Sequence, residues 1–311
     1  MVSEALEIPT LDCTPVLDRL ERIRREGVWP HGPRDLWADA LGLILLLSLY
    51  QELGEEEYLR EAEWLALEVD RVLGRRRGIR MAEHPDGQGQ SFRSLAIWIF
   101  ALHRLGQFLP PFQARALALV REIHAPFVRP DEGIISRMDE GLGRPFPASE
   151  AGKLEVFLGL SVYRLVGPEA LRPEIEELEG MVRKTCRSLA PDNGADLGLL
   201  LWTAHFFPGE PLSILLRERA LAALDARWIS PPGYFRRSLS DPWNGPVRSD
   251  FLAITNFSAA IGLQAQGVWT HRVQAIHRYF RDSYSWDSRP SDPLASVLYP
   301  ASLRPGLLLR G

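Results

Sequence analysis

The chain has 311 residues, of which 46% are hydrophobic and 24% charged, and its formal net charge is −4. This composition is typical of a globular protein and argues against disorder, while the small negative charge gives no reason to expect a nucleic-acid partner. Two cysteines, Cys13 and Cys186, are too few for a disulfide framework or a Cys-rich zinc site. We therefore expect residues 1–311 to form one domain.

Two segments bear on location. Residues 1–10 have neither the basic nor the apolar region of a secretory signal. The most apolar run, about residues 41–50, is shorter than the roughly 20 residues that a membrane-spanning helix needs. We expect a cytoplasmic protein without a membrane partner, and the sequence does not indicate its oligomeric state.

Two kinds of predicted helix alternate along the chain. An amphipathic helix over 14–27 precedes a helix over 35–53 that is apolar nearly all round. The same pair recurs at 55–74 and 91–105, 111–124 and 150–166, 173–189 and 196–207, 212–229 and 250–266, and 270–284 and 291–303. A helix that is apolar on every side must be buried on every side. The pattern predicts an all-α (α/α)6 toroid, with six amphipathic helices around six buried ones.

Glycines support this division into repeats of stacked helix pairs. Gly54, Gly106 and Gly167 follow the first three buried helices, where a helix C-terminus favours a left-handed residue. An open α-solenoid is the alternative architecture, and the number of pairs favours a closed ring.

Long connections gather on one face of this predicted ring. Residues 74–90, 125–149 and 230–249 each link an amphipathic helix to the next buried helix, and short β-hairpins are predicted near 133–137 and 233–236. Long loops in compact domains are usually functional. Six helix N-termini converge on the same face and favour carboxylates or anionic ligands there. We therefore expect the functional site at the N-terminal ends of the buried helices.

Acidic and aromatic side chains are abundant near these ends. Carboxylates can transfer protons at a sugar, and aromatic rings stack on its apolar faces. The acids near the helix starts are Asp35, Asp39, Asp86, Glu150, Glu155, Asp192, Asp196, Asp250 and Asp292. The candidate catalytic acids are Asp86, Glu150, Asp196 and Asp250. The candidate substrate-binding residues are Trp37, His84, Gln90, Arg93, Arg137, Tyr234, Trp243, Arg248 and Asn256. Helix capping is the alternative role for Asp35, Asp196, Asp250 and Asp292.

A hairpin near the N-terminus carries a resemblance. Residues 40–65 read ALGLILLLSLYQELGEEEYLREAEWL: a buried helix, a turn with glycine and acids, then Tyr-Leu and an amphipathic helix. This pattern resembles the hairpin of six-hairpin glycosidase-like proteins. The resemblance implies the toroid, and an activity among hydrolases, unsaturated-uronide hydrolases and sugar epimerases. It transfers no catalytic residue, because the uronide-hydrolase Trp-Ala-Arg-Gly-Asn-Gly-Trp pattern is missing and only His205 lies on a late buried helix, where the epimerases have two histidines.

These observations lead to three functional hypotheses. The first is a carbohydrate-active enzyme, glycoside hydrolase-like or else a sugar isomerase or epimerase. It would use carboxylates on a small sugar-like substrate, without metal or cofactor. The second is a non-catalytic toroid that binds a ligand or acts as a scaffold, in which case the rim carboxylates would be dispersed and individually paired. The third is a terpenoid-cyclase-like toroid with an apolar, aromatic-lined cavity, although the chain has neither a DDxxD nor a DxDD run.

Overall fold

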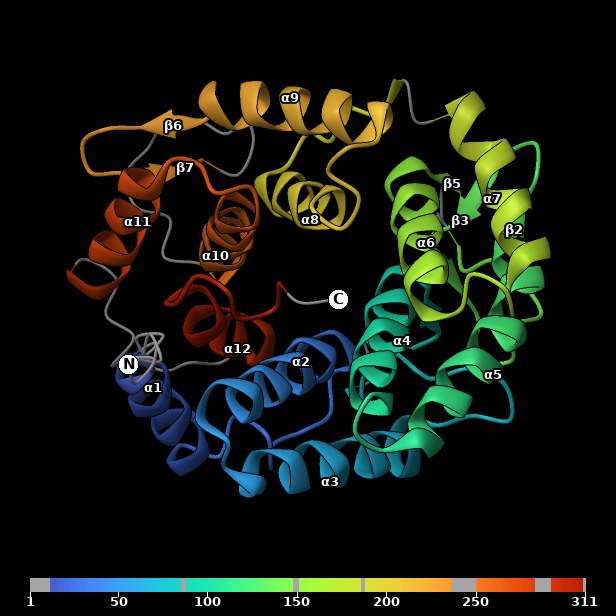
Figure 1. Ribbon diagram of the computed structural model, residues 1–311, viewed down its shortest axis with the longest axis horizontal. Coiled ribbons are helices and arrows are strands. Elements are labelled where there is room, and N and C mark those ends of the chain that lie inside the picture. The colour runs from blue at the N-terminus through green and yellow to red at the C-terminus, as the bar shows by residue number, and fades with distance from the viewer. Residues whose placement is uncertain are drawn as a thin grey trace, which may run out of the picture.

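The computed structural model describes residues 12–84, 88–147, 151–185, 188–236, 250–282 and 292–309. Helices of these ranges form two concentric rings (Figure 1), and contact between α12 and α2 closes the inner ring. The outer helices are α1 (Thr14–Arg25), α3 (Glu56–Leu73), α5 (Pro110–Phe127), α7 (Arg172–Thr185), α9 (Pro211–Asp225) and α11 (Thr270–Asp282). The inner helices are α2 (Leu36–Leu53), α4 (Phe92–Gly106), α6 (Lys153–Val166), α8 (Gly194–Ala204), α10 (Asp250–Ala265) and α12 (Pro293–Ser302). The predicted all-α (α/α)6 toroid is confirmed.

Helix α2 illustrates why the inner helices form and where they stop. Between residues 36 and 49 only Trp37 is not buried, so the apolar surface of the helix is packed against other parts of the protein on all sides. Asp35 caps its start by accepting a hydrogen bond from the Ala38 amide at 2.9 Å. Gly54 ends it in the left-handed conformation, with φ of 73°. This helix is also long and apolar enough to cross a membrane, and 72% of it is buried inside the ring.

Helices α8 and α10 approach each other backbone to backbone through two glycines. A Cβ atom on Gly198 would lie 2.3 Å from the Ser258 carbonyl group, and one on Gly262 would lie 2.4 Å from the Gly198 oxygen. Both neighbours are main-chain atoms of a packed helix, which cannot move aside as a flexible side chain would. The pair of glycines therefore sets the distance between the two helices.

We expect Gly198→Ala to lower the free energy of unfolding by about 1–3 kcal/mol, because the added methyl group overpacks this contact. Gly180→Ala in α7 is the matched control, because nothing lies within 4 Å of its added Cβ. That change should stabilise the protein by about 0.5–1 kcal/mol, since it only removes glycine from a helix interior. Urea denaturation followed by circular dichroism measures both, and equal effects at the two positions would contradict the packing argument.

Short strands occupy the connections that lead into the inner helices. Strand β1 (Gln90–Ser91) pairs with β4 (Arg137–Met138), and β3 (Gly133–Ile135) lies between β2 (Val128–Arg129) and β5 (Ala151–Gly152). Strand β6 (Trp228–Ile229) pairs with β7 (Tyr234–Phe235). Strands therefore occur at both predicted places, and they brace the loops around the start of α4, α6 and α10.

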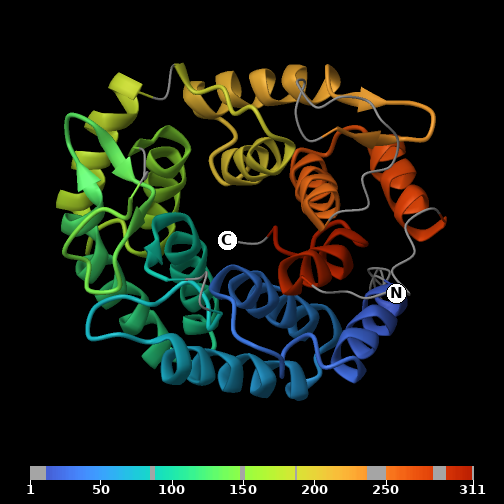
Figure 2. The same ribbon diagram turned by 180° about the vertical axis from the view of Figure 1, so that it is seen from behind.

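The last described residues follow α12 toward the middle of the ring, as both views show (Figure 1, Figure 2). The Trp202 indole donates a hydrogen bond to the Leu308 carbonyl at 2.8 Å, and His205 Nε2 lies 2.8 Å from the Leu309 carbonyl. The Leu308 amide donates to the Ser48 hydroxyl at 3.4 Å. Since these partners lie near the C-terminal ends of α8 and α2, the C-terminal segment, residues 303–309, closes that end of the ring.

Candidate active site

A network of charged side chains joins three consecutive inner helices at their N-terminal ends. Arg93 of α4 donates to Oε1 of Glu155 on α6, from Nε at 3.2 Å and from Nη2 at 2.8 Å. Its Nη1 donates to Oδ1 of Asp196 on α8. Asn193, the N-cap of α8, donates from Nδ2 to Asp196 Oδ2 at 2.9 Å. One guanidinium therefore holds two carboxylates together at the opening of the ring.

Trp37 adds an aromatic face to this network. It lies in the first turn of α2, the inner helix before α4, and the Arg93 guanidinium carbon lies 5.8 Å from the centre of its ring. This distance is within the range of a cation–π contact. Four consecutive inner helices thus contribute one side chain each, and of the four only Trp37 also lines the small apolar cavity on the axis of the ring.

Local structure holds Glu155 in this position. The Glu155 side chain is 7% exposed, and a Cβ on Gly152 would lie 1.7 Å from its Oε2. Glycine at the start of α6 is therefore required for the carboxylate to fold back over the helix end. Burial by itself would lower the pKa of Arg93, but the charges of Asp196 and Glu155 outweigh burial and raise it above its ordinary value.

The other half of the opening is acidic. Asp35, Asp292 and Asp250 lie at the N-terminal ends of α2, α12 and α10, and the first two cap their helices. Burial raises the pKa of Asp35, against the effect of the Ala38 hydrogen bond, and the charge of Asp292 raises it further. Burial also raises the pKa of Asp292, to which the charge of Asp250 contributes. Asp35 and Asp292 therefore retain a proton to a higher pH than usual.

A buried ion pair lies beneath Asp35. Asp39 Oδ1 accepts hydrogen bonds from the Trp29 indole at 2.9 Å and from Arg34 Nη1 at 3.2 Å. Its Oδ2 is buried and has no partner among the described residues. Burial raises the pKa of Asp39 to about 7, despite the opposing effects of Arg34 and Trp29. This carboxyl group thus titrates near neutral pH inside the protein.

Of the residues predicted from the sequence, the structure brings Trp37, Arg93 and Asp196 together. Asp250 lies on the acidic side of the same opening. His84 is exposed and lines a separate cavity of about 450 Å³ with Asp35 and the start of α12. The predicted residues that lie outside the described ranges are Asp86, Glu150, Trp243 and Arg248.

Two other candidates hold the loops in place. The Gln90 amide is completely buried; it accepts a hydrogen bond from the Ile79 amide and donates to the carbonyls of Arg77 and Glu140, each at 2.8 Å. Asn256 is also completely buried and binds both the amide and the carbonyl of Phe235, at 2.7 and 2.9 Å. Because the polar atoms of both side chains are engaged by the main chain, we assign them a structural role and leave them out of the proposed site.

Arg137 and Tyr234 also make contacts within the loops. Arg137 donates from Nε to the Gln88 carbonyl at 2.9 Å, and its guanidinium lies 3.9 Å from the centre of the Phe146 ring. Tyr234 is 8% exposed and stacks on Tyr279 of α11, with 4.8 Å between ring centres. Both residues hold loop segments in place, and neither belongs to the Arg93 network.

The sequence places Glu155 among the acids near the helix starts but does not single it out as one of the four candidate catalytic acids. Its position in the repeat carries a signal: Glu155 and Asp196 are each the third residue of adjacent inner helices. Side chains at equivalent positions of neighbouring helices point toward the same part of a ring. Aligning the helix starts would therefore have selected Glu155 together with Asp196.

The structure also bears on the kind of ligand. Among the described residues, no three His, Cys, Asp or Glu side chains are grouped as a metal site. The apolar cavity on the ring axis has a volume of about 30 Å³, which is too small for the terpenoid-sized cavity of the third hypothesis. Two carboxylates that share one arginine also differ from the dispersed, individually paired acids that the non-catalytic hypothesis predicts.

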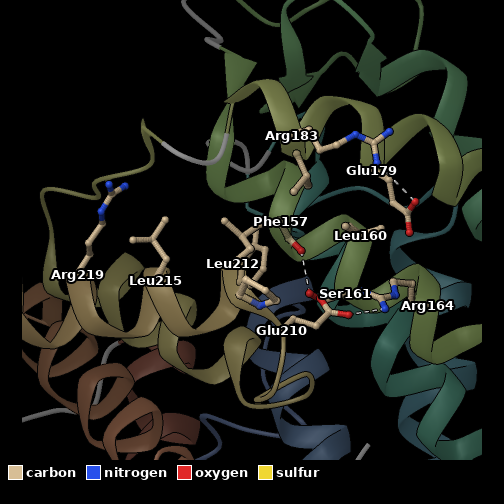
Figure 3. A pocket seen from close by; sticks show the side chains of 12 residues that line it. Phe157, Leu160, Ser161, Arg164, Glu179, Arg183, Glu210, Leu212, Leu215 and Arg219 are labelled. Carbon is tan, nitrogen blue, oxygen red and sulfur yellow. Dashed lines mark hydrogen bonds and ion pairs between the residues drawn. The ribbon is translucent and has the colours of Figure 1, made fainter.

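A larger cavity of about 730 Å³ lies on the outer wall between α7 and α9 (Figure 3). Its charged groups include two ion pairs, Arg164 with Glu210 at 2.5 Å and Arg183 with Glu179 at 4.0 Å. It lies outside the ring and away from the convergent helix N-termini. Because the carboxylates at the opening combine charge, burial and an aromatic face, we place the candidate site there rather than in the larger cavity.

Comparison with known proteins identifies the fold. No family model and no curated protein matches the sequence. Among solved structures, a cellobiose 2-epimerase from Bacillus thermoamylovorans has a TM-score of 0.61 at 9% identity, with 87% of each chain covered.

Two further structures are similar. A D-mannose isomerase has a TM-score of 0.57 at 10% identity, covering 88% of this chain and 76% of its own. An α-mannanase of family GH76 from Bacteroides thetaiotaomicron has a TM-score of 0.55 at 10% identity, covering 82% and 73%. The resemblance to six-hairpin toroid proteins is thus confirmed at the level of the fold.

Proposed function

We propose that this protein is a carbohydrate-active enzyme that moves protons on a small sugar, as an isomerase or epimerase does. The observation that carries the proposal is the Arg93, Glu155 and Asp196 network beside Trp37, at the opening of a toroid. Support also comes from the similar structures, which include a sugar epimerase, a cellobiose 2-epimerase and a mannose isomerase.

In this proposal, each side chain of the network has a chemical role. Glu155 and Asp196 accept and return the proton on the carbon next to the sugar carbonyl. Three N–H groups of Arg93 bind these two carboxylates, and a guanidinium has five. The remaining N–H groups can donate to the sugar oxygen on which negative charge develops. Trp37 offers a flat surface for the apolar face of the ring.

Glycoside hydrolysis is the second candidate, and the acidic half of the opening favours it. A hydrolase needs one carboxyl group that is protonated near neutral pH to donate to the leaving oxygen. The pKa values of Asp35 and Asp292 are raised by burial, so either could supply that proton. The similarity to an α-mannanase points in the same direction.

Incubation with aldoses, ketoses and short oligosaccharides in D2O separates the two reactions. An isomerase or epimerase exchanges the proton next to the carbonyl, so deuterium enters a carbon–hydrogen bond of the sugar, which NMR detects. A hydrolase releases new reducing ends without carbon-bound deuterium. We expect exchange with at least one free sugar, and no change in any substrate of the panel would contradict both candidates.

Variants of the two carboxylates assign the reaction to this site. We expect Glu155→Gln and Asp196→Asn each to lower kcat/KM by about 10²–10⁴, since each removes a proton-transfer group. Glu169→Gln is the control, because that side chain is 82% exposed in a surface ion pair with Arg172. Full activity of both site variants would move the chemistry to another part of the rim.

In the same proposal the enzyme works in the cytoplasm, consistent with Cys13 being a free, buried thiol.

A further inference from the structure

The axis of the ring is closed directly beneath the proposed site. The small axial cavity is lined by Trp37 at the level of the network and by Leu308 of the C-terminal segment, with Leu41, Ile97 and Leu199 among the residues between them. Its volume is about 30 Å³. A single water needs about 10–15 Å³ by the same kind of measure, so one or two waters fit and a sugar ring does not. A sugar must therefore lie above this cavity.

The depth of the site follows from helix geometry. Leu41 lies four residues after Trp37, and Ile97 lies four residues after Arg93. Four residues are about one helical turn, or about 5.4 Å along the axis. Leu41 and Ile97 thus form an aliphatic layer about one turn below the charged network, and Leu308 lies deeper in the same cavity, near the C-terminal ends of α2 and α8. A hydroxyl group pressed against this layer would lose its hydrogen bonds to water without replacement.

Leu308 closes the deeper end of this cavity, and among the residues that line it only Leu308 does not come from an inner helix. Its side chain is completely buried, and its backbone is held by Trp202 and Ser48. We propose that Leu308 is a built-in plug that limits the site to one terminal sugar ring, bound with a C–H face toward the axis. The substrate class is then a free monosaccharide or the end residue of a short oligosaccharide, and not the interior of a polymer. This substrate limit rests on the proposed function.

The plug can be tested without any sugar. Leu308 has a φ of 64°, a conformation that glycine adopts freely, so Leu308→Gly removes the side chain without straining the backbone. We expect Leu308→Gly, and to a smaller extent Leu308→Ala, to bind benzene in ligand-observed NMR, because the emptied space is apolar. Wild type and Leu307→Ala should not, since Leu307 is buried but does not line the axial cavity. The proposal that Leu308 is a plug would be refuted if the wild type bound benzene as well as Leu308→Gly does, or if a folded Leu308→Gly protein bound none.

A second measurement tests the substrate limit. For a sugar that the wild type converts, we compare kcat/KM with that of derivatives carrying a phenyl group on each ring position in turn. The derivative pointing toward the axis should be at least about 10-fold poorer for the wild type, and Leu308→Gly should recover about 10-fold, whereas Leu307→Ala should not. Equal use of all derivatives by the wild type would refute the limit. If the wild type converts no sugar, the proposed function fails, while the benzene result still decides whether Leu308 is a plug.

Discussion

Replacing Arg93 with methionine is expected to lower the free energy of unfolding at neutral pH by about 3 kcal/mol and to abolish most turnover. The substitution keeps the aliphatic part of the side chain but leaves Glu155 and Asp196, 7% and 21% exposed, without their cation. Removing one partner of a buried ion pair costs about 3–5 kcal/mol, and the partial exposure of Arg93 places this case at the lower end. A loss of about 10² or more in kcat/KM follows from the loss of a charge-stabilising donor.

A combined variant separates stability from catalysis. Adding Glu155→Gln and Asp196→Asn to Arg93→Met removes the two uncompensated charges, so it should restore most of the lost unfolding free energy and none of the turnover. Arg172→Met is the control, because that guanidinium is 63% exposed and its pair with Glu169 contributes at most about 1 kcal/mol. Urea denaturation of all three variants checks the expectation. Wild-type stability of Arg93→Met would show that the carboxylates do not depend on this arginine.

Asp39→Asn is expected to remove a large dependence of stability on pH. The folded-state pKa of Asp39 is about 7, above its ordinary value of 3.8, because burial favours the protonated form. The native state therefore binds more protons than the unfolded state between these values, and stability from this group is lost as the pH rises from about 4 through about 7. The difference in pKa corresponds to about 4 kcal/mol, on the order of 1.4 kcal/mol per pH unit.

The comparison isolates Asp39 from the other buried acids. Asparagine keeps an oxygen for the Trp29 indole and is neutral at every pH, while Asp35 and Asp292 are present in both proteins. We expect the unfolding free energy of Asp39→Asn relative to wild type to rise by about 4 kcal/mol between pH 4 and pH 8. Thermal and urea unfolding at several pH values measure this difference. A constant difference across the range would show that Asp39 is charged in the folded protein throughout.

Much of the fold could be predicted because all-round apolarity has one physical solution, which is burial on every side. The predicted helix at 35–53 is observed as Leu36–Leu53, and that at 91–105 as Phe92–Gly106. The helix expected at 196–207 begins earlier, at Gly194, because Asn193 rather than Asp196 supplies the cap. Asp196 is thereby an acid of the first turn that binds Arg93 and not the N-cap, whereas Asp35 and Asp292 do cap their helices.

The candidate site was predicted less completely, for a reason that Gln90 and Asn256 illustrate. A polar residue in an apolar helix or at its start needs a partner, and the sequence shows this need but not which atoms meet it. In both cases the partners are main-chain groups of a nearby loop, at Ile79 and Phe235.

Periodicity and the alternation of helix types are local properties, so the amino-acid sequence was sufficient to determine the alternating amphipathic and buried helices and the face on which their acidic starts converge, while a closed ring was favoured over an open solenoid only by the number of helix pairs. The pairing of charges is a property of the closed ring. Arg93 is 62 residues from Glu155 and 103 residues from Asp196, and Leu308 is 260 residues from Ser48. Only the tertiary structure decided which acids share an arginine and that residues 303–309 close the axis, because closing the ring brings together helices that no local pattern connects.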